Sequence, residues 1–162
     1  MSRASLIPAA SLGYQVNYLA RLLAHALRER IESLGVVPAQ FAQLLALYEQ
    51  DGLTLAQLCA RVEIQQPTMA TLSRMQRDGL IDRVPDPADG RRSLVMLTLR
   101  ARELEPQLVS AACAVNAVAT QGLDEQAVVV FLATLATIID NIEKAGQRIA
   151  KKSNQVRTPA ER

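Results

Sequence analysis

Residues that carry enzymatic and metal chemistry are scarce in this sequence. The 162 residues include a single histidine, His25, and two cysteines, Cys59 and Cys113. These residues show no metal-ligand spacing, and the chain has neither a glycine-rich phosphate loop nor a Ser/His/Asp set whose spacing suggests catalysis. The sequence therefore gives no support for an enzyme or a metal sensor, and we expect no catalytic residue, cofactor or metal site.

The two cysteines also lack any surrounding motif. Free cysteine is among the most buried residue types, so we expect Cys59 and Cys113 to be reduced core residues of a cytoplasmic protein; a redox pair is the alternative. The N-terminus has no uninterrupted apolar core, and no apolar run approaches the ~20 residues that a membrane span needs. We therefore expect neither a signal peptide nor contact with a membrane.

Aromatic side chains make up only 3% of the chain and tryptophan is absent, whereas apolar residues make up 49%. The core must therefore be built from leucine, alanine, valine and isoleucine. Glycine and proline number only seven each, which favours a mainly helical fold. The length indicates one domain, residues 1–162, with a sizeable core.

Positive charge is concentrated in one part of the chain. The formal net charge of +2 does not by itself indicate a nucleic-acid binder. The segment between residues 65 and 92, however, carries long cationic side chains, whereas its acids are short and lie near predicted turns or caps. These cationic residues are Arg74, Arg77, Arg83, Arg91 and Arg92.

This basic segment belongs to a stretch, residues 54–98, that we interpret as two short helices followed by a β-hairpin. Thr54 and Gln57 have the spacing of a capping box at the start of the first helix. Pro67 suits the first turn of the second helix, and Gly79 suits its C-terminal end. Apolar positions on the second helix predict a buried stripe of Met69, Leu72 and Met75, which Gln76 could extend.

The expected hairpin has strands at residues 80–84 and 93–98. The intervening residues 85–90 are the densest turn signal in the chain, and the tip carries Asp89, Gly90, Arg91 and Arg92. Two helices and a basic hairpin, taken together, are an arrangement suited to reading DNA in two grooves.

Residues 66–98 resemble the winged helix-turn-helix core of the MarR family (multiple antibiotic resistance regulators). The shared features are, in order, an Arg-Asp-Gly-Leu-Ile-x-Arg junction at residues 77–83, an Asp-Pro-x-Asp-x-Arg-Arg wing tip at residues 86–92, and a closing Leu-Thr at residues 97–98. The family often has glycine shortly after this pair, where this chain has Ala101. The resemblance implies a mainly α fold with a small β-hairpin wing.

Long amphipathic helices flank the stretch. We expect a DNA-binding lobe at residues 38–98, dimerisation helices at 11–34 and 99–150, and a flexible tail at 151–162. Pro106 predicts a kink or restart in the helix after the wing. The flanking helices carry more apolar surface than a compact winged helix needs, and we expect a two-fold homodimer to cover it. A monomeric bundle is the alternative.

The resemblance implies a cytoplasmic, sequence-specific regulator of transcription that binds double-stranded DNA as a homodimer on a pseudo-palindromic operator. It further implies a ligand-responsive repressor whose effector is an aromatic or phenolic acid. The alternative is a winged helix that serves as a protein-interaction module without sequence-specific DNA binding.

Four residues of the second helix are candidates for the major groove. Gln can bond adenine and Arg can bond guanine, while a Thr methyl group can contact that of thymine. These candidates are Gln66, Thr68, Thr71 and Arg74. For Arg74, base reading and phosphate contact remain equally open.

The hairpin supplies the minor-groove candidate, Arg91, because narrow A·T-rich grooves attract a guanidinium. In the resembling family the acid of the tip commonly pairs with the arginine, which would give Asp89 a supporting role. Asp89 is also an ordinary hairpin-turn residue. Arg77, Arg83 and Arg92 are candidates for phosphate contacts or solvated charges.

The resemblance also places an effector pocket near the first helix. There, His25, Tyr14 and Tyr18 are candidate pocket residues. An exposed histidine and core or interface tyrosines are the alternative interpretation.

Overall fold

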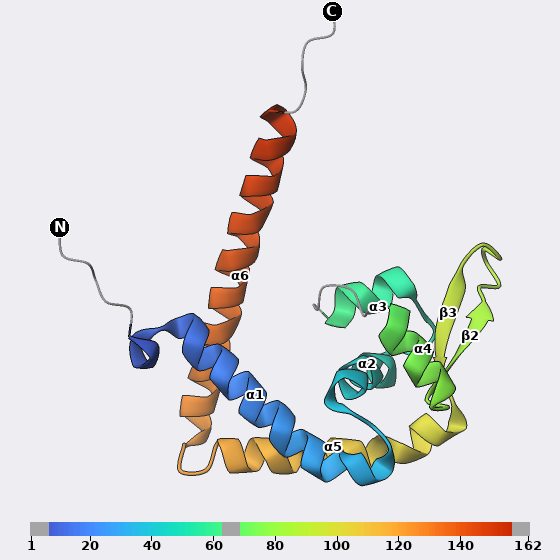
Figure 1. Cartoon of the computed structure of the whole chain (residues 1–162), viewed down its shortest axis with the longest axis horizontal. Helices are drawn as coiled ribbons and strands as arrows, with labels where there is room; N and C mark the ends of the chain where they lie inside the picture. The colour runs from blue at the N-terminus through green and yellow to red at the C-terminus, as the bar shows by residue number, and fades with distance from the viewer. Residues whose placement is uncertain (1–6, 63–68, 157–162) are drawn as a thin grey trace, which may run out of the picture. The chain divides into compact units, whose positions relative to one another are not determined.

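The computed structural model describes residues 7–62 and 69–156 of the chain. It divides into two compact units, residues 1–119 and 120–162. The helices and strands follow in chain order (Figure 1): η1 Pro8–Ala10, α1 Leu12–Ile31, η2 Glu32–Leu34, α2 Pro38–Glu49, β1 Leu53–Thr54, α3 Leu55–Val62, α4 Met69–Arg77, β2 Ile81–Pro85, β3 Ser93–Leu97, α5 Leu99–Ala119 and α6 Glu125–Val156. The prediction of a mainly α fold with a β-hairpin is confirmed.

The hairpin is part of a three-stranded antiparallel sheet in the order β1-β3-β2. Val95 of β3 pairs with Arg83 of β2 on one side and with Leu53 of β1 on the other. Strand β1 was not predicted, because two residues are too few to show the period-two alternation of a strand. Beyond the sheet's base, the β2–β3 hairpin projects away from α4 (Figure 1).

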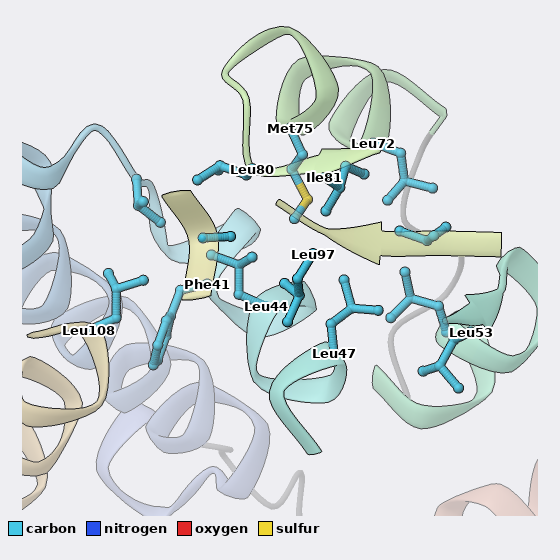
Figure 2. Close-up of a cluster of buried hydrophobic side chains, with 14 of the residues drawn as sticks. Phe41, Leu44, Leu47, Leu53, Leu72, Met75, Leu80, Ile81, Leu97 and Leu108 are labelled. Carbon is cyan, nitrogen blue, oxygen red and sulfur yellow. The ribbon is translucent and has the colours of Figure 1, made fainter. Parts of the chain in front are cut away.

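The core of the first unit is aliphatic, as the composition predicts. Figure 2 shows side chains from α2, α4, the sheet and α5 meeting around Leu44 and Leu47. Leu72 and Met75 of α4 are fully buried, which confirms two positions of its predicted stripe, but Gln76 is exposed. Each large aliphatic side chain buried here stabilises the fold by roughly 1.5–3 kcal/mol.

The predicted helix caps form. The Thr54 amide donates to Oε1 of Gln57 at 2.8 Å, and the Gln57 amide donates to Oγ1 of Thr54 at 3.3 Å. After α4, Gly79 has φ of 66° and the Leu80 amide reaches the Met75 carbonyl at 2.9 Å. This hydrogen bond spans six residues, from Met75 to Leu80, and turns the chain from α4 into β2. The turn needs a left-handed backbone conformation at Gly79, which glycine adopts without strain.

Helices α1 and α5 lie side by side in the first unit (Figure 1). Helix α5 continues through Pro106 and does not restart there, contrary to one of the two predicted outcomes. A proline removes one backbone hydrogen bond, but residues on both sides of it are anchored: Ala101 and Leu108 are fully buried.

Cys113 on α5 is exposed and Cys59 is half-buried, so the prediction of two core thiols is wrong. Helical periodicity places Cys113 away from the buried Leu108 and Val115.

The second unit contains α6, which begins as predicted with the Asp124 carboxylate accepting from the Ala127 amide at 2.7 Å. The helix extends to Val156, so residues 151–156 are not the predicted tail; residues 157–162 lie outside the described part. The helix is longer than predicted because residues 147–156 contain no glycine or proline that would end it.

Helix α6 is also long and apolar enough, by length and composition, to cross a membrane between Glu125 and Arg148, with a mean hydropathy of 1.5. The expectation that no run approaches that length was wrong, because residues 127–139 are apolar apart from two threonines and carry no charge. Its apolar side chains are exposed, with Phe131 at 51% and Ile142 at 71%. Core helices of soluble proteins have the same length and composition, so one such helix is weak evidence for a membrane span.

Asp51 joins three elements of the first unit and was not singled out from the sequence. Its Oδ1 accepts from the amides of Gly52 and Leu97, each at 2.9 Å, and its Oδ2 pairs with Arg102 of α5. The side chain is only 19% exposed. One carboxylate therefore holds the turn after α2, the end of β3 and the first turns of α5.

We expect Asp51→Ala to lower the free energy of unfolding by about 1–3 kcal/mol, because a buried amide loses its acceptor. Urea denaturation measures this change. Asp140→Ala is the matched control, since it removes an exposed pair with Lys144 on α6 and should cost less than about 0.5 kcal/mol. Equal losses in the two variants would contradict the role given to Asp51.

The phenol of Tyr48 provides a test at high pH. It donates to the Ala101 carbonyl at 2.8 Å, and burial, together with the negative charge of Glu105, raises the pKa of Tyr48 from 10.0 to about 12. The folded state therefore holds this proton more tightly than the unfolded state, and the resulting stability is present below pH 10 and lost as pH rises toward about 12. We expect Tyr48→Phe to remove this part of the pH dependence, as measured by urea denaturation across that range. The same slope in both proteins would contradict the assignment.

Candidate nucleic-acid interface

Helix α4 has one buried and one exposed face. Leu72 and Met75 point into the core, whereas Ala70, Ser73 and Arg74 are exposed. The exposed face is thus small, polar and cationic, which allows close approach to a groove and a favourable interaction with phosphate.

The structure places two of the four predicted major-groove residues on this helix. Arg74 is exposed and Thr71 is half-buried. Gln66 and Thr68 lie outside the described residues, and their roles stay predictions. Arg77, in the last turn, is exposed, and its Nε lies 3.4 Å from Oδ1 of Asp78.

The tip of the β2–β3 hairpin is ordered by its two aspartates. Asp86 Oδ1 accepts from the Ala88 amide at 2.8 Å. Asp89 Oδ1 accepts from the Arg91 amide at 3.1 Å, and its Oδ2 lies 3.2 Å from Nε of Arg92. Carboxylate caps of this kind fix short turns, so the tip holds a defined shape.

The acid of the tip therefore pairs with Arg92 rather than with the side chain of Arg91. Arg91 is exposed, and among the described residues no acid pairs with its guanidinium. Asp89 holds only the backbone of Arg91, which leaves the cationic group available to an external anion. Asp89 is thus the expected turn residue, but the expectation that it pairs with the Arg91 side chain is wrong, because its carboxylate pairs with Arg92.

Arg83 was expected to be a solvated charge or a phosphate contact, but part of its guanidinium is buried. It pairs across the sheet with the buried Val95, so it shares the face of β2 that carries the buried Ile81. Its Nε and Nη2 are buried and have no hydrogen-bond partner among the described residues. The inward alternation of β2 explains this placement.

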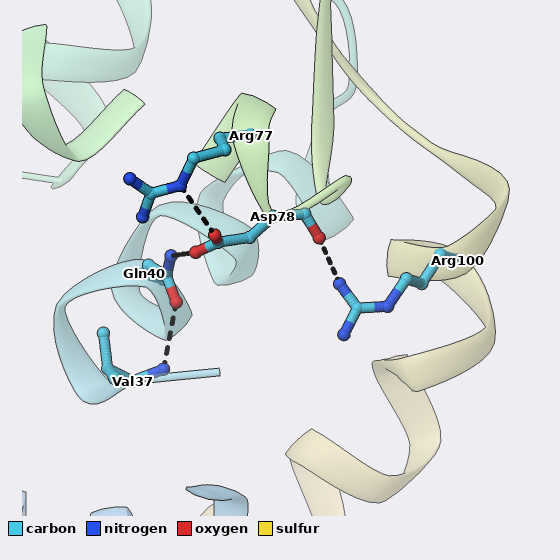
Figure 3. Close-up of polar contacts among 5 residues, drawn as sticks. All are labelled: Val37, Gln40, Arg77, Asp78 and Arg100. Carbon is cyan, nitrogen blue, oxygen red and sulfur yellow. Dashed lines mark hydrogen bonds and ion pairs between the residues drawn. The ribbon is translucent and has the colours of Figure 1, made fainter. Parts of the chain in front are cut away.

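A polar network fixes the C-terminal end of α4 (Figure 3). Gln40 of α2 is 2% exposed; its Nε2 donates to Oδ2 of Asp78 at 2.8 Å, and its Oε1 accepts from the Val37 amide at 3.1 Å. Sequence reasoning missed this residue. The available signal was a glutamine among the apolar positions of a buried helix, where it needs partners.

The three candidate pocket residues lie on α1. Tyr14 and Tyr18 are exposed and stacked, with ring centroids 6.4 Å apart, and Arg21 lies 5.7 Å from the Tyr18 ring centre. His25 has a side chain 71% exposed, with Nε2 lying 3.6 Å from Oε1 of Glu29. One helix face thus carries an aromatic pair and a cation.

Two hollows lie between α1 and α5 within the first unit. One, of about 530 Å³, is lined by Arg30, Ser33, Leu34, Pro106, Gln107, Ser110, Ala111 and Ala114. The other, of about 240 Å³, is lined by Leu19, Leu22, Leu23, Ala26, Arg30, Val115, Val118 and Ala119. Neither hollow includes His25, Tyr14 or Tyr18. Arg30 lines both, and no sequence motif had indicated it.

Within the described ranges 7–62 and 69–156, no group of three or more His, Cys, Asp or Glu side chains is arranged to hold a metal ion. The arrangement instead presents cationic and small polar groups on α4 and at the hairpin tip, which suits binding to a polyanion.

Comparison with known proteins links this geometry to one family. A model of the MarR family matches residues 34–92, from the end of η2 to the hairpin tip. The uncharacterised HTH-type transcriptional regulator YsmB of Bacillus subtilis is 31% identical over 83 residues, which cover 51% of this chain and 57% of YsmB. The match thus spans little more than half the length of that relative.

Solved structures extend the similarity over most of the chain. The PcaV transcriptional regulator of Streptomyces coelicolor, solved in complex with its natural ligand, is 30% identical with a TM-score of 0.75, covering 85% of this chain and 97% of PcaV. BpsR of Bordetella bronchiseptica, whose DNA binding is regulated by 6-hydroxynicotinic acid, is 25% identical with a TM-score of 0.74, covering 82% of this chain and 95% of BpsR. The chain belongs to the MarR family of transcriptional regulators.

Proposed function

We propose that this regulator binds a pseudo-palindromic operator in double-stranded DNA as a cytoplasmic homodimer and acts as a ligand-responsive repressor. One observation carries the proposal: α4 exposes a small, polar and cationic face, and the neighbouring hairpin tip presents Arg91, which has no acidic partner within residues 7–62 and 69–156. MarR-family membership supports it and disfavours the alternative of a protein-interaction module. The family is one of transcriptional regulators rather than enzymes.

In this proposal α4 enters the major groove. Arg74 and Thr71, with Gln66 and Thr68 before them, face the base edges, and Arg77 contacts a phosphate near the end of the helix. The buried Leu72 and Met75 support this orientation, because they fix which side of α4 faces away from the core.

The hairpin is the wing, and Arg91 enters the minor groove. Its support is electrostatic: the Asp89 carboxylate is already engaged by Arg92 and by the Arg91 amide, so it competes little for the Arg91 side chain. Arg92 contributes a phosphate contact once the wing is seated. Arg83 acts from within the sheet, as a support of the wing's base.

The proposal of a homodimer is supported by apolar side chains that are exposed in both units. Helix α1 exposes Leu12, Val16 and Leu22, and α6 exposes Phe131 and Leu132. Large apolar side chains that stay exposed repeatedly along one helix are typical of an interaction surface. A two-fold partner would cover them and would place two copies of α4 about 34 Å apart, one helical turn of DNA.

An aromatic or phenolic carboxylate is the proposed class of effector. PcaV has a natural ligand, and BpsR responds to 6-hydroxynicotinic acid, an aromatic acid. In this chain Tyr14, Tyr18 and His25 on α1 are the proposed contacts, and Arg30 at the α1–α5 hollows is a further cation that a carboxylate could reach. An effector that weakens DNA binding must itself bind the DNA-free protein more tightly.

The DNA proposal is tested by fluorescence anisotropy of the full chain with its own upstream intergenic DNA, a scrambled duplex, and two salt concentrations. We expect affinity for the native fragment to exceed that for the scramble by about 10³-fold or more and to fall with salt. Arg91→Ala should weaken binding roughly tenfold or more, and Arg74→Ala should reduce selectivity if it reads a base. Arg28→Ala, an exposed arginine on α1, is the control.

Equal and weak binding of both duplexes by the parent protein would contradict the DNA proposal. Unchanged binding by Arg91→Ala would remove the wing assignment alone. A uniform loss in Arg74→Ala, equal for both duplexes, would assign that arginine to a phosphate.

The oligomeric state is tested by sedimentation equilibrium. We expect twice the chain mass of 17.6 kDa for the parent protein, and a shift toward the monomer for Phe131→Asp, because a charge would be buried without a partner. Gln126→Asp, a polar substitution in the first turn of the same helix, should leave the mass unchanged. A monomeric parent protein would contradict the proposed homodimer.

A further inference from the structure

A single arginine at the start of α5, Arg100, bridges the ends of two other helices. Its Nη1 donates to the carbonyl of Asp78, the residue just after α4 (Figure 3). Its Nη2 donates to the carbonyl of Leu34, the last residue of η2, at 3.1 Å. Carbonyls at a helix C-terminus lack partners within the helix and carry partial negative charge. A guanidinium is therefore well suited to cap both.

The bridge also lies against the turn between α1 and α2. Gly35 has φ of 71°, and a Cβ added there would lie 3.1 Å from Nη2 of Arg100. The guanidinium thus packs closely on the backbone at the point where the chain leaves α1 and η2 for α2. A planar fork with several fixed donors can join two carbonyls in one geometry, whereas an ammonium group is a point donor.

Asp78 is held from two sides by different parts of the molecule. Its carboxylate accepts from Gln40, a buried residue of α2 that belongs to the same lobe as α4. Its carbonyl accepts from Arg100, which belongs to α5, the helix that packs on α1. The first contact keeps α4 in its lobe, and the second links the end of α4 to the α1–α5 pair.

We propose that Arg100 is a positioning residue that sets the orientation of α4 relative to α1 and α5, and thereby the half-site spacing that the dimer accepts on DNA. The inference rests on the proposed function. Because the two recognition helices of a dimer are joined only through the dimerisation helices, a small rotation at this bridge is carried across the two-fold axis and changes their separation. Arg100 touches neither base nor phosphate in this role.

The test measures spacing preference rather than affinity alone. Half-sites are first located by footprinting on the upstream fragment, and duplexes are then made with one base pair inserted or deleted between them. The parent protein should lose affinity sharply on either change. In Arg100→Met, which keeps the side-chain stem and removes the donors, the ratio of affinities for native and altered spacing should fall roughly tenfold.

Two further variants separate positioning from stability and from charge. Arg102→Met removes the ion pair with Asp51, so it should lower thermal stability but keep the parent's spacing ratio. Arg100→Lys keeps the charge without the fork, so it should lie nearer to Arg100→Met than to the parent. Arg100 is exposed, so its substitution leaves the core intact.

If Arg100→Met still binds DNA selectively and has the same ratio of affinities for native and altered spacing as the parent protein, this inference is overturned and the proposed function stands. A parent-like ratio in Arg100→Lys would overturn the bridging role of the fork. A parent protein that does not distinguish its upstream fragment from the scramble would overturn the proposed function, and this inference with it.

Discussion

Burial of α2 is the constraint on which the first unit depends. Leu44 and Leu47 are fully buried, and the helix contacts α4 and β3 as well as α1 and α5. A helix with apolar residues around most of its circumference must be covered on several sides. The elements proposed to read DNA and two of the proposed dimerisation helices, α1 and α5, are therefore built on one shared core, so a displacement of α1 or α5 shifts the packing of the DNA-reading elements.

Local signals in the sequence predicted the elements well. Thr54 with Gln57, Gly79 and Asp124 each act on backbone groups within a few residues of themselves, so their roles follow from spacing alone. Strand β1 and the contacts of Asp51 and Gln40 were not predicted. They join residues far apart in the chain, and such partners become identifiable only when the packing is known.

The candidate site divides in the same way. The exposed face of α4 followed from helical periodicity, and the turn chemistry of the wing tip followed from its aspartates. Which arginine an aspartate selects depends on side-chain geometry within a few ångströms, and Asp89 pairs with Arg92. The residues that line the two α1–α5 hollows, Arg30 among them, were not predicted, because a hollow between two helices depends on their relative rotation, which no single-helix pattern specifies.

The long uncharged stretch of α6 has a consequence for the newly synthesised chain. No charged residue lies between Glu125 and Asp140, and valine, phenylalanine and leucine side chains there are about half exposed. Until another surface covers it, such a helix favours aggregation during and after translation. If a second copy provides the cover, the stability of the protein rises with its concentration.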